Sequence, residues 1–298
     1  MEWLTVRQTA EKWNISERSV RNYCQEGRVP GAVLEQGAWQ IPAEALQPSR
    51  KKRQRKENET LLTRLQEEKA SGLKNGIYHR LQIEMTYNSN HIEGSQLSPE
   101  QTRFIYETHT LNTEQIAVPV DDIIETVNHF RCIDLAIDQA KKPVTQRLIK
   151  QLHLLLKSGT TNSTKNWFAV GNYKKLPNEV GGRPTTEPNR VPEKVKDLLS
   201  RYEALPNPTF RQLVEYHVRF EQIHPFQDGN GRIGRLLLLK ECLRHNLVPF
   251  IITEDLKLYY YRGLAEWDKE PGYLLDTCLA AQDRFKKLLE YFGIVYKE

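Results

Sequence analysis

The spacing of apolar residues from Leu61 to the C-terminus constrains the fold more than any other feature. These residues recur at intervals of three and four, which places them on one face of an α-helix. Leu236–Leu239 covers every side of a helix and predicts a central, buried one. We therefore expect a mainly α fold. The stripes are Ile123, Val127, Phe130, Ile133 and Ile137; Leu148, Leu152 and Leu155; Phe210, Leu213, His217 and Phe220; and Leu274, Cys278, Ala281, Phe285, Leu288 and Phe292.

The interval from Gly171 to Val191 breaks this helical pattern. It is rich in glycine and proline, and Asn178–Val180 can run extended, which predicts a loop or a small β-hairpin on the helical scaffold. Loops on rigid scaffolds often contact substrates, although a plain surface connection remains open. His217, by contrast, lies on an apolar helix face and is interpreted as a buried structural histidine.

Charge is distributed unevenly along the 298 residues. The chain has 43 Lys/Arg and 38 Asp/Glu, of which residues 1–56 hold 11 and 6, so the charges of the remainder cancel. This indicates a small basic module fused to a neutral body. We expect a first domain at residues 1–48, a basic linker at 49–59 and a second domain at 60–298.

The first 48 residues carry the signals of two short helices and a hairpin. Thr5 and Gln8 form a capping box, Ser16 can cap a second helix ending near Gln25, and Gly27 can end it. Val33–Ile41, interrupted by a glycine, is typical of a β-hairpin. This segment resembles the winged helix-turn-helix domains of the MerR and excisionase type.

That resemblance implies DNA binding through the second helix. Arg18, Arg21, Asn22 and Gln25 would face the major groove, and the basic run at residues 50–56 would neutralise phosphates. The alternative is a solvated helix face on a protein-docking module.

Several classes of protein are excluded or disfavoured by the sequence. No apolar run approaches the ~18 residues that cross a bilayer, and the first residues do not resemble an export signal, so we expect a cytoplasmic protein without a membrane partner. The cysteines lack the paired spacing of zinc or redox sites, which favours reduced thiols. They are Cys24, Cys132, Cys242 and Cys278.

The strongest chemical signal is the segment from His224 to Arg235. Pro225 should end the preceding helix, Asp228–Gly231 should form a turn, and the leucine-rich helix should begin immediately afterwards. A glycine-rich turn leading into a helix presents unpaired N–H groups and the positive end of the helix dipole, which together favour an anion.

The charged side chains of this segment extend that prediction. Arg232 and Arg235 are unfavourable at a helix N-terminus unless an anion lies between them. Asp228 is a single carboxylate, which suits Mg²⁺ bound together with phosphates, and His224 can act as a base near pH 7. The segment therefore predicts phosphoryl or nucleotidyl transfer from a magnesium nucleotide. A simple β-turn without a ligand is the alternative. A calcium-binding loop is excluded, because the segment lacks the series of carboxylates that such a loop requires.

Residues 224–235 match the Fic signature HPFx(D/E)GNGRxxR throughout, so the chain resembles the Fic family. The resemblance implies a Fic-type helical bundle with a small β-hairpin flap, here preceded by the winged helix-turn-helix. It also implies transfer of AMP from ATP to a Tyr, Thr or Ser hydroxyl of a protein, which could be this chain itself.

The resemblance assigns roles by position. His224 would be the general base, Phe226 a core anchor and Asp228 the Mg²⁺ ligand, while Gly231 distinguishes the chain from the phosphorylating Doc branch. The implied ATP-binding residues are Asp228, Gly229, Asn230, Gly231, Arg232, Ile233, Gly234 and Arg235, the flap residues Asn178, Glu179, Val180 and Gly181, and Tyr260, Tyr261 and Asp268. Gly171–Lys174 would begin the flap, which holds a target chain by strand addition.

An upstream segment predicts inhibition of this site. Ser98, with Pro99 and Gln101 after it, is a strong helix start, and Gly94 suits the end of the helix before it, around residues 84–94. Ser89–Gly94 matches the inhibitory motif (S/T)xxxE(G/N) of Fic proteins. By resemblance, Ser89, Glu93 and Gly94 are inhibitory, and Glu93 would pair with Arg235 and displace the γ-phosphate of ATP.

Two other functions remain open from the sequence. One is a DNA-binding regulator that uses the Fic core as a nucleotide sensor, although the intact His224 favours catalysis. The other is an enzyme that also removes AMP. The protein target, the operator and the oligomeric state, including a homodimer, are left open.

Overall fold

The computed structural model describes residues 2–35, 37–48, 60–111 and 117–294. The chain divides into two compact units, Met1–Glu57 and Asn58–Glu298. The predicted linker at residues 49–59, with its basic run, lies outside the described residues. Across the described ranges, no helix is both long and apolar enough to span a membrane, and the four cysteines are buried free thiols.

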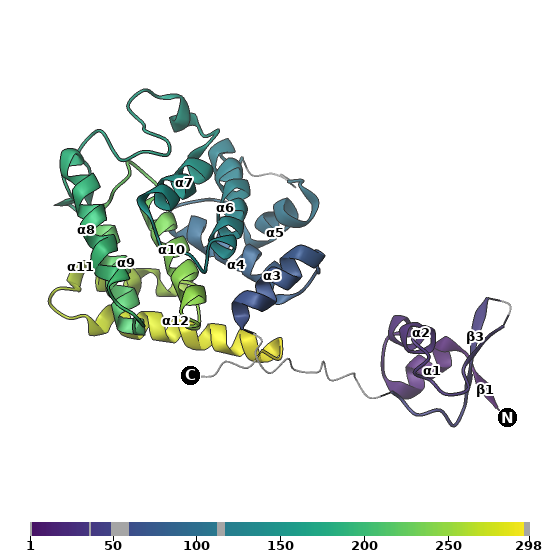
Figure 1. Ribbon diagram of the computed structural model, residues 1–298. Coiled ribbons are helices and arrows are strands. Elements are labelled where there is room, and N and C mark those ends of the chain that lie inside the picture. The colour runs from purple at the N-terminus through teal and green to yellow at the C-terminus, as the bar shows by residue number, and fades with distance from the viewer. Residues whose placement is uncertain (1, 36, 49–59, 112–116, 295–298) are drawn as a thin grey trace. The chain divides into compact units, whose positions relative to one another are not determined.

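The described residues of the first unit form two helices and a three-stranded antiparallel sheet in the order β1-β3-β2 (Figure 1). Its elements are β1 (Trp3–Leu4), α1 (Val6–Trp13), α2 (Glu17–Gln25), β2 (Val33–Glu35) and β3 (Ala38–Pro42). The predicted capping box at Thr5 and the cap at Ser16 are both present. Strand β1 was not expected, because two residues carry no periodic signal; it pairs Leu4 with Ile41.

The second unit is mainly helical, which confirms the predicted mainly α fold. Its elements are α3 (Leu61–Ser71), α4 (Ile77–Ile92), α5 (Pro99–Thr108), α6 (Val120–Asp138), α7 (Gln146–Lys157), β4 (Glu179–Val180), β5 (Arg183–Pro184), α8 (Val191–Glu203), α9 (Phe210–Ile223), α10 (Asn230–Arg244), α11 (Lys257–Glu266) and α12 (Gly272–Tyr291). Its described residues also form short 3₁₀ turns at Thr161–Thr164, Pro188–Arg190 and Glu254–Leu256. The predicted hairpin in the glycine-rich interval is the two-stranded sheet β4–β5.

Helix α10 lies in the middle of the second unit and packs against α3, α4, α6, α7 and α9 (Figure 1). Leu236–Leu239 are all buried, as the run of four leucines predicts. Burying a leucine side chain stabilises the folded state by roughly 1.5–3 kcal/mol. The packing of these leucines therefore holds α10, and with it the residues at its N-terminus, firmly in place.

Candidate active site

The loop between α9 and α10 is fixed by two local features. His224 adopts a left-handed conformation (φ 50°) and ends α9 directly before Pro225, as the proline predicts. Asn230 then closes the loop, because its side chain accepts the Phe226 N–H (2.8 Å) and donates to the Phe226 carbonyl (2.9 Å). Helix α10 begins at Asn230, behind a left-handed Gly229 (φ 84°). The expectation that the helix begins after Gly231 is therefore wrong, since the last two residues of the expected turn are already helical.

His153 of α7 packs against this loop through a ring contact and a hydrogen bond. Its ring stacks on fully buried Phe226 at 3.9 Å between centroids. Nδ1 accepts the Gly171 N–H (2.9 Å), so Nε2 carries the proton and donates to the Asp228 carbonyl (3.2 Å). Burial, followed by the Lys157 charge, lowers the pKa of His153 to about 3, which keeps the ring neutral.

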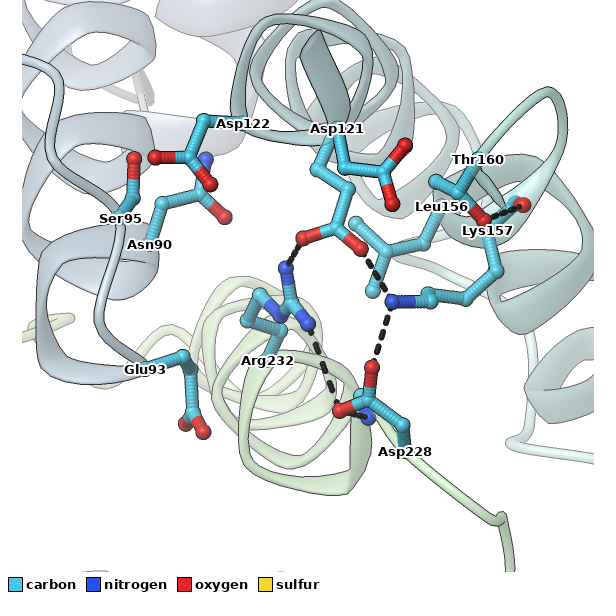
Figure 2. Close-up of polar contacts among 12 residues, drawn as sticks. Asn90, Glu93, Ser95, Asp121, Asp122, Leu156, Lys157, Thr160, Asp228 and Arg232 are labelled. Atoms are coloured by element: carbon cyan, nitrogen blue, oxygen red, sulfur yellow. Dashed lines mark hydrogen bonds and ion pairs between the residues drawn. The ribbon is translucent and has the colours of Figure 1, made fainter. Parts of the chain in front are cut away.

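Asp228 and Arg232 belong to a network of four charged side chains (Figure 2). Lys157 donates to Asp228 Oδ2 at 2.5 Å and also contacts Glu125. Arg232 contacts the other oxygen of Glu125, and its Nη2 lies 3.6 Å from Asp228 Oδ1. Burial opposes ionisation of Asp228, but Arg232 and Lys157 outweigh it and lower the pKa to about 2.

Arg235, one helical turn further along α10, contacts the end of α4. Its Nη2 donates to Glu93 Oε1 at 2.7 Å, and Nε donates to Ser89 Oγ at 3.0 Å. Glu93 is the C-cap of α4 and Gly94 follows in a left-handed conformation (φ 102°). Although burial opposes ionisation, Arg235 and Arg232 lower the pKa of Glu93. The helix itself is longer than expected, since it begins at Ile77 rather than near residue 84.

Gly231 allows the close approach of Glu93 to α10. A Cβ at this position would lie 2.3 Å from Glu93 Oε1 and 3.0 Å from Arg235 Nη1. Any other residue would therefore force the Glu93–Arg235 pair to move. The two glycines are thus required for different reasons. Gly229 adopts a left-handed backbone conformation, whereas Gly231 leaves room for the Glu93 side chain.

Two guanidinium nitrogens in the first turns of α10 are buried without a hydrogen-bond partner within the described residues. They are Arg232 Nε and Arg235 Nη1. Buried polar atoms are rarely left unpaired in proteins, and both belong to guanidinium groups at the positive end of a helix. This part of the helix therefore favours an anionic ligand.

His224 is half-buried and neutral at pH 7. Burial, followed by the nearby Lys174 ammonium, lowers the pKa of its ring to about 4, against smaller opposing effects that include Glu93 and Asp228. A neutral imidazole can accept a proton, so His224 is available as a base in the loop that leads into α10.

The β4–β5 hairpin is attached to the same loop. The Lys174 N–H donates to the Pro225 carbonyl (2.9 Å), and Asn178 Nδ2 donates to the Phe226 carbonyl (3.0 Å). Lys174 Nζ also donates to Asn178 Oδ1 (2.7 Å). Beyond these anchors Glu179, Val180 and Gly181 are exposed.

Tyr260, Tyr261 and Asp268, which the sequence also assigned to ATP binding, differ from one another in burial and in hydrogen-bond partners. Tyr260 is fully buried with its hydroxyl 2.6 Å from His217 Nε2, which satisfies His217 as a structural histidine on that side of its ring. Tyr261 donates to the Ile92 carbonyl at 3.3 Å, at the end of α4. Asp268 is exposed and pairs with Arg219 at 2.7 Å. The nucleotide-binding roles of these residues stay predictions.

Ile233 and Gly234 face inward. Ile233 is fully buried, and a Cβ on Gly234 would lie 2.4 Å from Glu221 Oε1 and 2.8 Å from His217 Cε1. Their assignment to ATP binding also stays a prediction.

Sequence reasoning missed Glu125, His153 and Lys157. Lys157 lies 32 residues from Glu125 and 71 from Asp228 in the chain, so no local pattern joins them. A lysine in the last turn of α7 also has an ordinary explanation in the helix dipole. In the parts of the chain that the structure describes, no three His, Cys, Asp or Glu side chains form a metal-binding group.

Comparison with known proteins agrees with this geometry. Residues 143–242 match the Fic/DOC family model. "Protein adenylyltransferase Fic" of Nematostella vectensis is 29% identical over 191 residues, covering 60% of this chain and 41% of that protein. The protein of the same name from Culex quinquefasciatus is 26% identical over 186 residues, covering 60% of this chain and 35% of that protein. The chain thus spans less than half the length of these curated relatives.

Solved structures share the fold of the second unit. A Fic domain containing signaling protein from Bacteroides thetaiotaomicron superposes with a TM-score of 0.62 at 23% identity, covering 80% of this chain and 98% of that one. A Fic family protein from Desulfovibrio desulfuricans gives 0.59 at 23% identity, covering 76% of this chain and 70% of that one. The loop and the β4–β5 hairpin both lie within residues 143–242, the segment of the chain that matches the Fic/DOC family model.

Proposed function

We propose that the second unit is a Fic-type protein adenylyltransferase, which transfers AMP from ATP to the hydroxyl of a Tyr, Thr or Ser side chain of a protein. The observation that carries the proposal is the pair of buried guanidinium groups with unpartnered N–H donors at the start of α10, with a neutral His224 in the loop that leads into it. The names of the relatives support the same reaction.

In this reaction His224 accepts the proton of the target hydroxyl as its oxygen attacks the α-phosphorus. The bond from the α-phosphorus to the bridging oxygen breaks, and diphosphate leaves with that oxygen. The amides of Gly229–Gly231 lie at a helix N-terminus and would bind the α- and β-phosphates. Arg232 and Arg235 would bind the β- and γ-phosphates and stabilise the charge that develops on the leaving group.

Asp228 fits a role as the Mg²⁺ ligand. Its carboxylate is ionised, partly exposed and already in contact with one cation, the Lys157 ammonium. A single carboxylate suits Mg²⁺ that takes its other ligands from phosphates and water. When bound there, the ion would neutralise charge on the phosphate oxygens.

The β4–β5 hairpin is proposed to hold the target protein. Its exposed residues Glu179 and Val180 can pair with an extended chain, and main-chain hydrogen bonds would then tolerate different side chains. Since the hairpin base is attached to Pro225 and Phe226, a chain bound there would lie near His224.

Glu93 is proposed to inhibit the enzyme. It occupies Arg235 Nη2 at 2.7 Å, and that guanidinium is the one assigned to the γ-phosphate. Both groups are anionic and compete for one cation. ATP would therefore bind in a productive position only when Glu93 moves away.

Incubation of the full chain and its Glu93→Gly form with ATP and Mg²⁺ tests the proposed reaction. Label from α-labelled ATP should enter protein, and label from γ-labelled ATP should not. Nucleotide binding without transfer would support the sensor, and transfer of the γ-label would indicate a kinase. Release of AMP from labelled protein, measured after ATP is removed, would identify an additional hydrolase.

We also propose that the first unit binds DNA through α2. Arg18, Arg21, Asn22 and Gln25 are all exposed on this helix, opposite its buried residues Val20 and Cys24. The β2–β3 hairpin occupies the position of a wing in the sequence order. A helix with this set of side chains can contact both phosphates and purine edges.

Replacing Arg18 and Arg21 with alanine is expected to weaken DNA binding about tenfold or more, because two phosphate-neutralising charges are lost. A gel-shift titration of the full chain against a mixed-sequence duplex of about 30 base pairs at low salt measures the effect. The Arg262→Ala/Arg284→Ala variant loses the same charge from the second unit and should bind like the wild type. Equal weakening in both variants would indicate a general charge effect and contradict the assignment to α2.

A further inference from the structure

Four charged side chains form a closed network beneath the proposed nucleotide site. Lys157, Glu125 and Arg232 are almost fully buried, with side chains 3%, 13% and 5% exposed, whereas Asp228 is 44% exposed. Glu125 comes from α6 and Lys157 from α7, whereas Asp228 lies in the loop before α10 and Arg232 in the first turn of that helix. Two positive and two negative charges sum to zero, so the network is neutral without any ligand.

Lys157 is held in place and cannot easily turn elsewhere. Its ammonium contacts Glu125 and lies 2.5 Å from Asp228 Oδ2. It lies 5.7 Å from the centre of the Phe168 ring. The aliphatic part of the side chain is packed beside Gly229, since a Cβ there would lie 3.6 Å from Lys157 Cδ.

Both oxygens of Asp228 are therefore occupied by the protein itself. Oδ2 accepts from Lys157, and Oδ1 accepts the Gly229 N–H at 2.6 Å with Arg232 Nη2 at 3.6 Å. A divalent cation that approached this carboxylate alone would be repelled by the two positive groups already beside it. A nucleotide changes this balance, because its phosphates bring several negative charges.

We propose that Lys157 is a built-in cation at Asp228, which holds the carboxylate in position and excludes a divalent metal until the nucleotide brings one. Metal and nucleotide then enter together, and the nucleotide-free protein does not bind the metal. Lys157 is a positioning residue in this account, since it acts through Asp228. The inference rests on the proposed nucleotide-binding function.

Titration of the full chain with Mn²⁺, followed by electron paramagnetic resonance without nucleotide, tests the inference. Wild type should leave Mn²⁺ free, whereas Lys157→Met should bind it about tenfold more tightly or better, because Asp228 and Glu125 then face a single arginine. Lys157→Arg keeps the charge and should behave like wild type. Lys157→Met combined with Asp228→Asn should lose the gain, which assigns the new site to Asp228.

Glu125→Gln is the matched control for a merely structural role. It removes the same Lys157–Glu125 ion pair as Lys157→Met, but it leaves the network more positive and should gain no Mn²⁺ binding. Equal gains in both variants, or no gain in Lys157→Met, would overturn the proposal. Thermal melts identify a variant that does not fold, and Lys157→Gln then replaces Lys157→Met.

Two measurements separate this inference from the function on which it rests. Tight Mn²⁺ binding by the nucleotide-free wild type overturns the role of Lys157 whatever the variants do. Calorimetry of the Glu93→Gly form with Mg²⁺ and ATP tests the nucleotide site itself, and failure to bind ATP would overturn the proposed function. Mn²⁺ binding by that form only when ATP is present is the expected result.

Discussion

Replacing Glu93 with glycine is expected to raise AMP incorporation into protein by roughly 5- to 150-fold, the range that corresponds to a coupling of 1–3 kcal/mol between two sites. In the native chain Glu93 Oε1 accepts from Arg235 Nη2 at 2.7 Å. Its removal frees the guanidinium for the γ-phosphate of ATP, while the buried contact from Ser89 to Arg235 remains. Labelling with α-labelled ATP at several ATP concentrations measures the change.

Two variants control this result. Glu93→Gln keeps the size of the side chain but removes its charge, so it should raise labelling less than glycine does. Glu100→Gln alters an exposed acid in the first turn of α5 and should leave labelling unchanged. Equal labelling by the wild type and Glu93→Gly would contradict the inhibitory role.

Replacing His224 with alanine is expected to lower AMP transfer by about 10²- to 10⁴-fold, the usual contribution of a general base. The measurement is made in the Glu93→Gly form, where the signal is largest. ATP affinity, measured by calorimetry, should change only slightly, because the phosphates are assigned to α10 and its arginines. If transfer persists at a comparable rate, another group accepts the proton and the assignment of His224 is wrong.

The pH dependence follows from the same residue. The pKa of His224 is lowered to about 4, so the ring is already deprotonated at pH 6. AMP transfer should then stay level between pH 8 and pH 6 and decline only as the pH approaches 4. A base with the ordinary histidine pKa of about 6.5 would retain only about a quarter of its activity at pH 6. Initial rates with saturating ATP distinguish the two profiles.

Local signals in the sequence predicted much of the fold. Ser98, Pro99 and Gln101 specify the start of α5 through bonds that span only three residues, and the capping box is present. Pro225 likewise predicts the end of α9 at the residue before it. The start of α10 was placed too late, because the glycines on either side of Asn230 favour a turn, whereas Asn230 is already helical and bonds to Phe226.

The site was only partly predictable, because some of its residues are far apart in the sequence. The motif names His224, Asp228, Arg232 and Arg235, because they lie within one turn and one helix start. The support beneath them comes from α6 and α7, and nothing in the sequence of those helices distinguishes Glu125 or Lys157 from a solvated charge. The burial of Tyr260 against His217 is equally a result of tertiary packing.

The β4–β5 hairpin has a base that is fixed by hydrogen bonds and an outer edge whose side chains are exposed. Lys174 and Asn178 donate hydrogen bonds from the base of the hairpin to the backbone carbonyls of Pro225 and Phe226. A target chain held by the hairpin, as proposed, would therefore keep a fixed position relative to His224. The outer edge at Glu179 and Val180 makes no such hydrogen bond to the loop among the contacts described. Under the proposed function, exchange of these two side chains would direct the protein to new targets and leave His224 and its loop unchanged.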